Sequence, residues 1–233
     1  MAEIELNKRI RSFLDSAGRK STNRDYARAL DDLKAAELLD RDNPAVLYNL
    51  GICYTRTGLH AAAVDYFKRL LLLPSTFVEV ITVKKLLAYC LIMDGGHALA
   101  LTQLDECLAM SRRDAVAMNM KGYCLEHLGK YAEAIEVFRD LLELDPHNSN
   151  AWNSMAYLLA LSGGDLNEAL RFAKAAVDSS PDNPAYLDTI GYVYLKKNMS
   201  DMAKNFLKKA LALMPDSDDI KAHLNELLKI DGA

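Results

Sequence analysis

The residues best suited to metal binding, acid–base catalysis or redox chemistry are five histidines and four cysteines. The histidines form no HExxH motif and no other pair with the spacing of metal ligands. The cysteines form no CxxC pair and have no histidine at such a spacing. The motifs G-x-S-x-G, G-x-x-x-x-G-K-[ST] and G-x-G-x-x-G are absent too. The sequence therefore predicts a protein that is not an enzyme and uses no metal or cofactor.

The bulk composition is typical of a folded soluble protein. Of the 233 residues, 51% are hydrophobic and 26% are charged. The formal net charge of -4 provides no overall basic field for nucleic acid or anionic lipid. No stretch approaches the roughly 20 uninterrupted apolar residues of a membrane span. Glu3 and Glu5 stand where a signal peptide is basic. We expect a cytoplasmic protein, the alternative being an exported protein whose leader has been removed.

Small residues recur along the chain with a fixed period. One series has steps of 37, 34, 34 and 35 residues: Gly51, Ala88, Gly122, Ala156, Gly191. A second has steps of 34, 37, 34, 35 and 34 residues: Ala29, Ala63, Ala100, Ala134, Ala169, Ala203. Four residues after each alanine of the second series comes a mostly larger apolar residue: Leu33, Phe67, Leu104, Phe138, Ala173, Leu207. The insertions fall at the same places in both small-residue series, so the chain is built from repeats of about 34 residues.

Each repeat is predicted to be a pair of antiparallel helices. Apolar residues spaced four and then three apart share one helical face. Asn43-Pro44 and Asn183-Pro184 are typical of an N-cap followed by proline in the first turn. Glycines that can end a first helix in the left-handed conformation lie midway through four repeats: Gly58, Gly95, Gly129, Gly163. The small residue of the first helix and the alanine of the second should mark the closest approach of the pair.

These features together resemble the tetratricopeptide repeat, whose pattern is W-x2-L-G-x2-Y…A-x3-F…P. Two segments follow it closely: Leu47-x2-Leu50-Gly51-x2-Tyr54…Ala63-x3-Phe67, and Leu187-x2-Ile190-Gly191-x2-Tyr194…Ala203-x3-Leu207…Pro215. The match is weaker over 149–183, where Trp152 holds the tryptophan position, and weakest over 81–114. The resemblance covers roughly residues 10 to 217.

The resemblance implies an all-α fold, a right-handed superhelical solenoid of about six antiparallel helix pairs plus a C-terminal capping helix. We place the repeats at 10–43, 44–77, 81–114, 115–148, 149–183 and 184–217, within one domain spanning 1–233. Residues 18–23 are predicted to form a longer, basic loop inside the first repeat. The capping helix is expected at 218–230, with Ser217 as its N-cap.

In this family the first helix of each pair lines a concave groove that holds a peptide or a partner helix. The resemblance therefore implies these groove residues: Tyr48, Asn49, Lys85, Tyr89, Asn119, Tyr123, Glu126, Asn150, Asn153, Tyr157, Asp188, Tyr192. Four of them are tyrosines at one repeat position, which suits a binding surface. Asparagine amides can pair with an extended backbone. The alternative is that the tyrosines pack between neighbouring first helices and are only partly exposed.

We thus expect an adaptor that binds a protein or peptide partner in the concave groove. One alternative is a self-assembling scaffold, joined through the convex face or through the apolar segment 70–80. Another is a regulatory module of a larger enzyme. Cys53, Cys90 and Cys124 share one repeat position, two residues after the small residue of the first helix, which predicts buried thiols at the junction of first and second helices.

Overall fold

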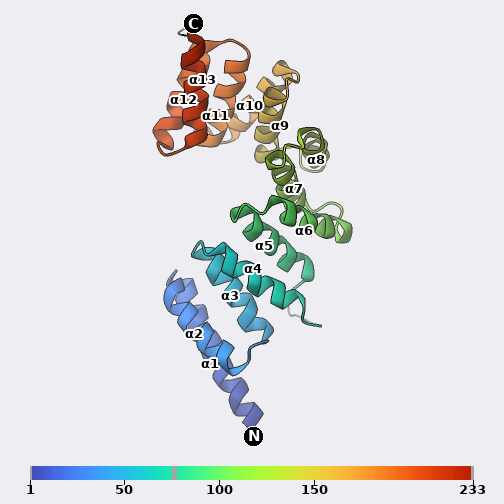
Figure 1. The fold of residues 1–233 in the computed structure, drawn as a ribbon, viewed down its shortest axis with the longest axis vertical. Helices are drawn as coiled ribbons and strands as arrows, with labels where there is room; N and C mark the ends of the chain where they lie inside the picture. Colours follow the sequence, from blue (N-terminus) through green and yellow to red (C-terminus); the bar gives the residue numbers. More distant parts are fainter. Residues whose placement is uncertain (1, 75–77, 232–233) are drawn as a thin grey trace. The chain divides into compact units, whose positions relative to one another are not determined.

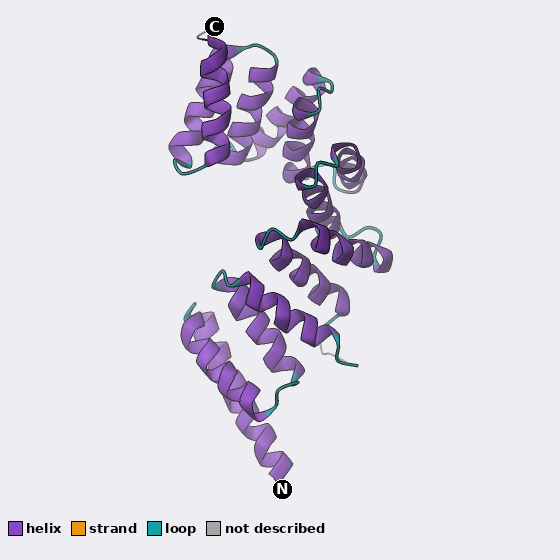
Figure 2. Cartoon of the chain, in the orientation of Figure 1, coloured by secondary structure: helices purple, strands orange, loops and turns teal. Residues whose placement is uncertain are grey.

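The protein folds as a succession of α-helices. The computed structural model describes residues 2–74 and 78–231, and within them it contains thirteen helices and no strand (Figures 1 and 2). In chain order they are α1 (Ala2–Thr22), α2 (Tyr26–Leu39), α3 (Pro44–Arg56), α4 (His60–Leu71), α5 (Val80–Met93), α6 (His97–Met110), α7 (Ala115–His127), α8 (Tyr131–Leu144), α9 (Ser149–Leu161), α10 (Leu166–Ser179), α11 (Pro184–Lys196), α12 (Ser200–Leu213) and α13 (Asp218–Asp231). Sequential antiparallel pairs followed by one further helix confirm the predicted all-α repeat fold.

The contacts within the chain define two compact units, residues 1–120 and residues 121–233. Unit 1 contains α1 to α6 and the start of α7. Unit 2 contains the end of α7 and α8 to α13. The single domain expected from the sequence stays a prediction.

The helix boundaries follow the capping signals of the sequence. The Asn43 side-chain oxygen accepts hydrogen bonds from the backbone N–H groups of Ala45, at 3.1 Å, and Val46, at 3.3 Å. The Asn183 oxygen accepts one from Ala185 at 3.0 Å. Ser217 caps α13 by accepting from Ile220 at 3.4 Å. These bonds satisfy N–H groups that have no partner inside the helix.

The first repeat departs from its predicted form. Residues 18–22 are helical, so the expected loop over 18–23 is wrong apart from its last residue. The Lys20 ammonium reaches α2 and pairs with the Asp32 carboxylate at 2.6 Å, which holds the end of α1 against α2. The chain instead turns at Arg24, whose φ of 61° lies in the left-handed region. The helix α1 also extends beyond the predicted start of this repeat at residue 10, since it begins at Ala2.

The apolar segment expected over 70–80 is only partly within the described residues, since 75–77 lie outside them. Leu70 is buried at the end of α4, and Leu72, just after that helix, is 84% exposed. Val80 begins α5 and is 43% exposed.

The two helices of a pair meet where a glycine faces a large side chain. A Cβ atom added to Gly122 of α7 would lie 2.4 Å from the Phe138 ring of α8. At Gly51 the same atom would lie 2.6 Å from the Phe67 ring. Phe67 and Phe138 are completely buried, so neither ring has open space to move into. The predicted close approach is confirmed in these pairs.

All four cysteines are buried free thiols, as predicted. Two of them, Cys53 and Cys90, contact a neighbouring first helix as well as lying in the core. The Cys90 sulfur on α5 is 3.1 Å from the Thr55 hydroxyl on α3, and the Cys53 sulfur on α3 is 3.6 Å from the Ser21 hydroxyl on α1. These contacts join successive first helices. Burial raises the pKa of Cys124 to about 11, so this thiol is a poor nucleophile at neutral pH.

We predict that Gly122→Ala lowers the free energy of unfolding by about 1–3 kcal/mol, because the new methyl group overlaps a ring that cannot move away. Gly18→Ala is the control. A Cβ atom at Gly18 meets nothing within 4 Å. That variant should be more stable than the wild type by about 0.5–1 kcal/mol, because alanine has a higher helix propensity than glycine. Urea denaturation followed by circular dichroism measures both. Equal stability of Gly122→Ala and the wild type would contradict the close approach.

Candidate protein-binding site

The structure places every predicted groove residue on a first helix. They are Tyr48 and Asn49 on α3, Lys85 and Tyr89 on α5, Asn119, Tyr123 and Glu126 on α7, Asn150, Asn153 and Tyr157 on α9, and Asp188 and Tyr192 on α11. We call the surface formed by the first helices within each unit its first-helix face.

The four tyrosines of one repeat position differ in exposure. Tyr89 is 42% exposed and Tyr123 is 41% exposed, whereas Tyr157 is half-buried. Tyr192 is only 4% exposed, so its predicted place on an open groove is wrong. The cause is α13, whose His223 ring has its centroid 4.4 Å from that of Tyr192. The capping helix therefore covers the first-helix face of the last repeat.

Two charged groove candidates are bonded inside the fold. Lys85 pairs with Asp114 at 2.7 Å. Asp188 is 9% exposed and accepts from the His223 ring, whose Nδ1 lies 2.9 and 3.1 Å from its two oxygens. The partners are 29 positions apart in the first bond and 35 in the second. A repeat pattern does not specify such pairings between side chains. Lys85 and Asp188 thus have structural partners that sequence reasoning did not foresee.

The asparagines fall into two groups. The Asn49 amide donates to the backbone oxygen of Ala45 at 2.8 Å, and the Asn150 oxygen accepts from the Tyr186 hydroxyl at 2.7 Å. Asn119 and Asn153 are half-buried, and neither side chain has a hydrogen-bond partner among the described residues. The Oδ1 atom of Asn153 is itself buried. A buried amide oxygen without a partner costs free energy that a bound donor can restore.

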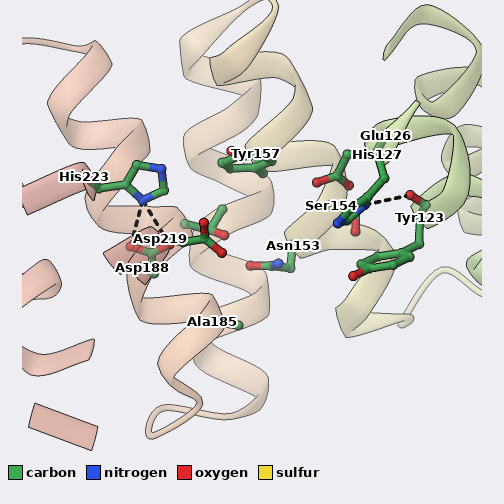
Figure 3. A pocket seen from close by; sticks show the side chains of 11 residues that line it. Tyr123, Glu126, His127, Asn153, Ser154, Tyr157, Ala185, Asp188, Asp219 and His223 are labelled. Atoms are coloured by element: carbon green, nitrogen blue, oxygen red, sulfur yellow. Dashed lines mark hydrogen bonds and ion pairs between the residues drawn. The ribbon is translucent and has the colours of Figure 1, made fainter. Parts of the chain in front are cut away.

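A polar pocket of about 360 Å³ lies on the first-helix face of unit 2 (Figure 3). Its walls come from α7, α9, α11 and α13: Tyr123, Glu126, His127, Asn153, Ser154, Tyr157, Ala185, Asp188, Thr189, Asp219, His223. Five of these were groove candidates: Tyr123, Glu126, Asn153, Tyr157 and Asp188. Sequence reasoning missed the others. His127 could have been found, because it follows Tyr123 by one helical turn. Asp219 and His223 could not, because they lie outside the repeats.

The pocket is acidic. It contains the carboxylates of Glu126, Asp188 and Asp219 and no lysine or arginine. Burial raises the pKa of Glu126 to about 7, since no described side chain donates to its carboxylate or pairs with it. Burial also raises the pKa of Tyr157 to about 12, and the negative charges of Glu126, Asp219 and Asp188 add to this effect.

Unit 1 carries a different pocket on its own first-helix face. It also measures about 360 Å³ and is lined by Ile52, Thr55, Arg56, Leu86 and Tyr89. Its single charged lining group is the Arg56 guanidinium, which extends from an exposed position at the end of α3. Tyr89 is one of the groove residues expected from the sequence.

Neither pocket resembles a metal centre. In residues 2–74 and 78–231, no three or more His, Cys, Asp or Glu side chains are grouped so that they could hold a metal ion. No helix in the same ranges is long and apolar enough to cross a membrane.

Stacked helix pairs with side chains presented by their first helices define a helical-repeat protein. Sequence profiles of the tetratricopeptide repeat match residues 19–75, 94–149, 125–191 and 185–217. The chain therefore belongs to the tetratricopeptide repeat family, as the sequence analysis expected. Such repeats generally mediate contacts between proteins and are typically non-catalytic.

Similar curated proteins match part of the chain. It is 27% identical over 135 residues to the BBSome complex member BBS4 of Bos taurus, covering 56% of this chain and 25% of that protein. It is 26% identical over 121 residues to the Photosystem I assembly protein Ycf3 of Cyanophora paradoxa, covering 45% of this chain and 70% of that one. The match thus spans only a quarter of the length of BBS4.

Solved structures share the fold. A structure described as "YrrB: a TPR protein with an unusual peptide-binding site" aligns with a TM-score of 0.65 and 25% identity, covering 80% of this chain and 94% of that one. A chain of the APC/C hetero-tetramer Cut9-Hcn1 aligns with a TM-score of 0.73 and 16% identity, covering 93% of this chain and 42% of that one. The second likeness shows the fold alone.

We predict that Glu126→Gln stabilises the protein above pH 7. The folded-state pKa of Glu126, about 7, lies above its ordinary value of 4.5. Stability of the wild type is therefore lost as pH rises from 4.5 to 7, while the buried carboxylate becomes charged. At pH 8 the variant should gain about 1–2 kcal/mol in unfolding free energy, a value reduced for partial solvent access. At pH 4 the gain should vanish.

Glu143→Gln is the matched control, because Glu143 is exposed on α8. It should change stability by less than about 0.5 kcal/mol at either pH. Urea denaturation at pH 4 and pH 8 provides both comparisons. A Glu126→Gln variant that is less stable than the wild type at pH 8 would show that the carboxylate has a stabilising partner.

Proposed function

We propose that this chain is an adaptor that binds a segment of a partner protein through side chains of its first helices. The observation that carries the proposal is that each unit has a half-buried amide, Asn119 in unit 1 and Asn153 in unit 2, whose hydrogen-bonding groups have no partner among the described residues. An extended backbone offers the N–H and C=O groups that such amides require. Exposed rings on first helices, Tyr89 in unit 1 and Tyr123 in unit 2, provide apolar area for binding.

The names of the similar proteins support the same kind of function. BBS4 is a member of a complex, Ycf3 is an assembly protein, and the structure of YrrB has a peptide-binding site. Each description concerns an association with another protein or a peptide. They support a protein-binding role for this chain and leave the partner to be found.

We predict that the double substitution Asn119→Ala and Asn153→Ala weakens partner binding by roughly 1–3 kcal/mol, because two amides lose their bonds to the partner. The partner is first captured from source cells on the tagged wild-type chain and identified. Isothermal titration calorimetry then compares the wild type with the variant. Circular dichroism should show unchanged helix content, since neither amide has a described bond to lose.

Asn205→Ala is the control for this experiment. Asn205 is exposed on α12, a second helix, and lies away from the first-helix face. Removal of the Asn205 side-chain amide should leave the affinity for the partner unchanged. If the double variant folds and binds as tightly as the wild type, the first-helix face is not the binding surface.

Self-association is a second candidate function, favoured by two exposed leucines of unit 1. Leu38 on α2 is 89% exposed and Leu72, after α4, is 84% exposed. They occupy the same repeat position 34 residues apart, and the corresponding residues of unit 2 include the charged Glu143 and Asp178. Because exposed leucines in register form an apolar strip, they could join copies of the chain through their second helices.

We predict that, if this candidate is correct, the wild type forms oligomers that grow with concentration and Leu38→Glu with Leu72→Glu abolishes them. Two carboxylates in the contact would have to be desolvated, which is costly. Sedimentation velocity over a hundredfold dilution series measures the change. Leu213→Glu, at a 48% exposed position of α12, is the control. A wild type that is monomeric throughout the series would exclude this function.

A further inference from the structure

We propose that the pocket of unit 2 binds a positively charged side chain of the partner segment, and specifically an arginine guanidinium. This inference rests on the proposed function, because it identifies one residue of the segment that the first-helix face would bind. It is carried by the charges around the pocket, by acceptors without partners inside it, and by the aromatic side chains in its wall.

The charges around the pocket favour a cation. Carboxylates come from three helices, Glu126 on α7, Asp188 on α11 and Asp219 on α13, and no lysine or arginine is among the lining residues. The basic groups in the lining are two imidazoles. His223 is already bonded to Asp188, and His127 contacts the backbone oxygen of Tyr123 through its Nδ1 atom, at 3.0 Å. Asp219 is exposed and has no described ion pair.

Two acceptors in the pocket require donors that the described chain does not provide. The Glu126 carboxylate has no described hydrogen bond or ion pair, and the buried Oδ1 atom of Asn153 has none either. Leaving such groups without partners costs free energy in the unbound protein. A ligand with several N–H donors and a positive charge would satisfy both groups at once. A neutral or anionic ligand would leave the carboxylate uncompensated.

The shape and aromatic content of the pocket favour a guanidinium over an ammonium ion. Tyr123 and Tyr157 contribute rings to the wall, and Figure 3 shows both side chains with Asn153 and Glu126. A guanidinium is planar, carries five N–H donors, and stacks on aromatic faces. An ammonium ion is compact and more strongly hydrated, so it gains less from two separated acceptors and two rings. The volume of about 360 Å³ also accommodates the methylene groups of an arginine.

The test uses the whole chain, labelled with ¹⁵N, and three blocked tripeptides: acetyl-Gly-Arg-Gly-amide, its lysine counterpart, and its citrulline counterpart, which is neutral and of the same shape as arginine. NMR titration with the arginine peptide should shift the Asn153 side-chain amide and backbone amides near Tyr123 and Tyr157 in a saturable way. We expect citrulline to bind at least tenfold more weakly and lysine at least threefold more weakly. Equal binding of arginine and citrulline, or tighter binding of lysine, would overturn the assignment.

Glu126→Gln should weaken binding of the arginine peptide at least fivefold, whereas Glu143→Gln should leave it unchanged. The variant is expected to be more stable than the wild type at pH 8, so a loss of binding would not reflect unfolding. Wild-type affinity should rise between pH 6 and pH 8, as Glu126, whose pKa is about 7, becomes charged. His127 and His223 line the same pocket, so the part of the pH effect that Glu126 causes is the part that Glu126→Gln removes.

The outcome separates this inference from the proposed function. If the arginine peptide fails to bind but Asn119→Ala with Asn153→Ala still weakens the partner, the guanidinium assignment is wrong and the adaptor function stands. If the peptide binds at this pocket and the double substitution leaves partner affinity unchanged, the pocket is an arginine site, but the partner does not bind through Asn119 and Asn153, which overturns the proposed function. Shifts confined to residues outside the pocket would overturn the assignment.

Discussion

The rest of the structure depends on the close approach between a small residue of one helix and a large buried side chain of the next. Gly122 against Phe138 and Gly51 against Phe67 leave no room for even a methyl group. This contact fixes the separation of the two helices, and therefore which side of the first helix faces its partner. The opposite side is left to carry other residues. In each unit, that side carries the pocket residues.

The repeat explains why the fold was predictable and the site was not. Periodic small residues and caps such as Asn43 report on backbone packing, which recurs in every repeat. Hydrogen bonds between side chains do not recur. Lys85 and Asp188 occupy the same repeat position, yet one pairs with Asp114 and the other with His223. The loop predicted over 18–23 is helical over 18–22 because the helix propensity of Gly18 and its polar neighbours is only weakly unfavourable, and tertiary contacts such as Lys20 with Asp32 outweigh it.

The two pockets differ in chemistry although both lie on first-helix faces. Both lie on first-helix faces and have similar volumes, but one is lined by Arg56 with apolar side chains and the other by three carboxylates. The backbone of the repeats sets where a pocket lies, and the side chains that line it set its charge and its hydrogen-bonding groups. Fold similarity to YrrB or Cut9-Hcn1 therefore carries no information about which ligand this chain prefers. That information lies in pocket residues such as Glu126 and Asn153.

The docking of α13 links the end of the array to its binding chemistry. Ile220 packs against Leu187 and Ala210, and the same helix supplies Asp219 and His223 to the pocket of unit 2. The pocket is complete only in molecules whose last helix is docked. The apparent affinity for a ligand is then reduced by the docked fraction. By mass action, a bound ligand raises that fraction in turn. Fraying of a terminal helix, usually regarded as a local event, thus becomes a term in the binding equilibrium.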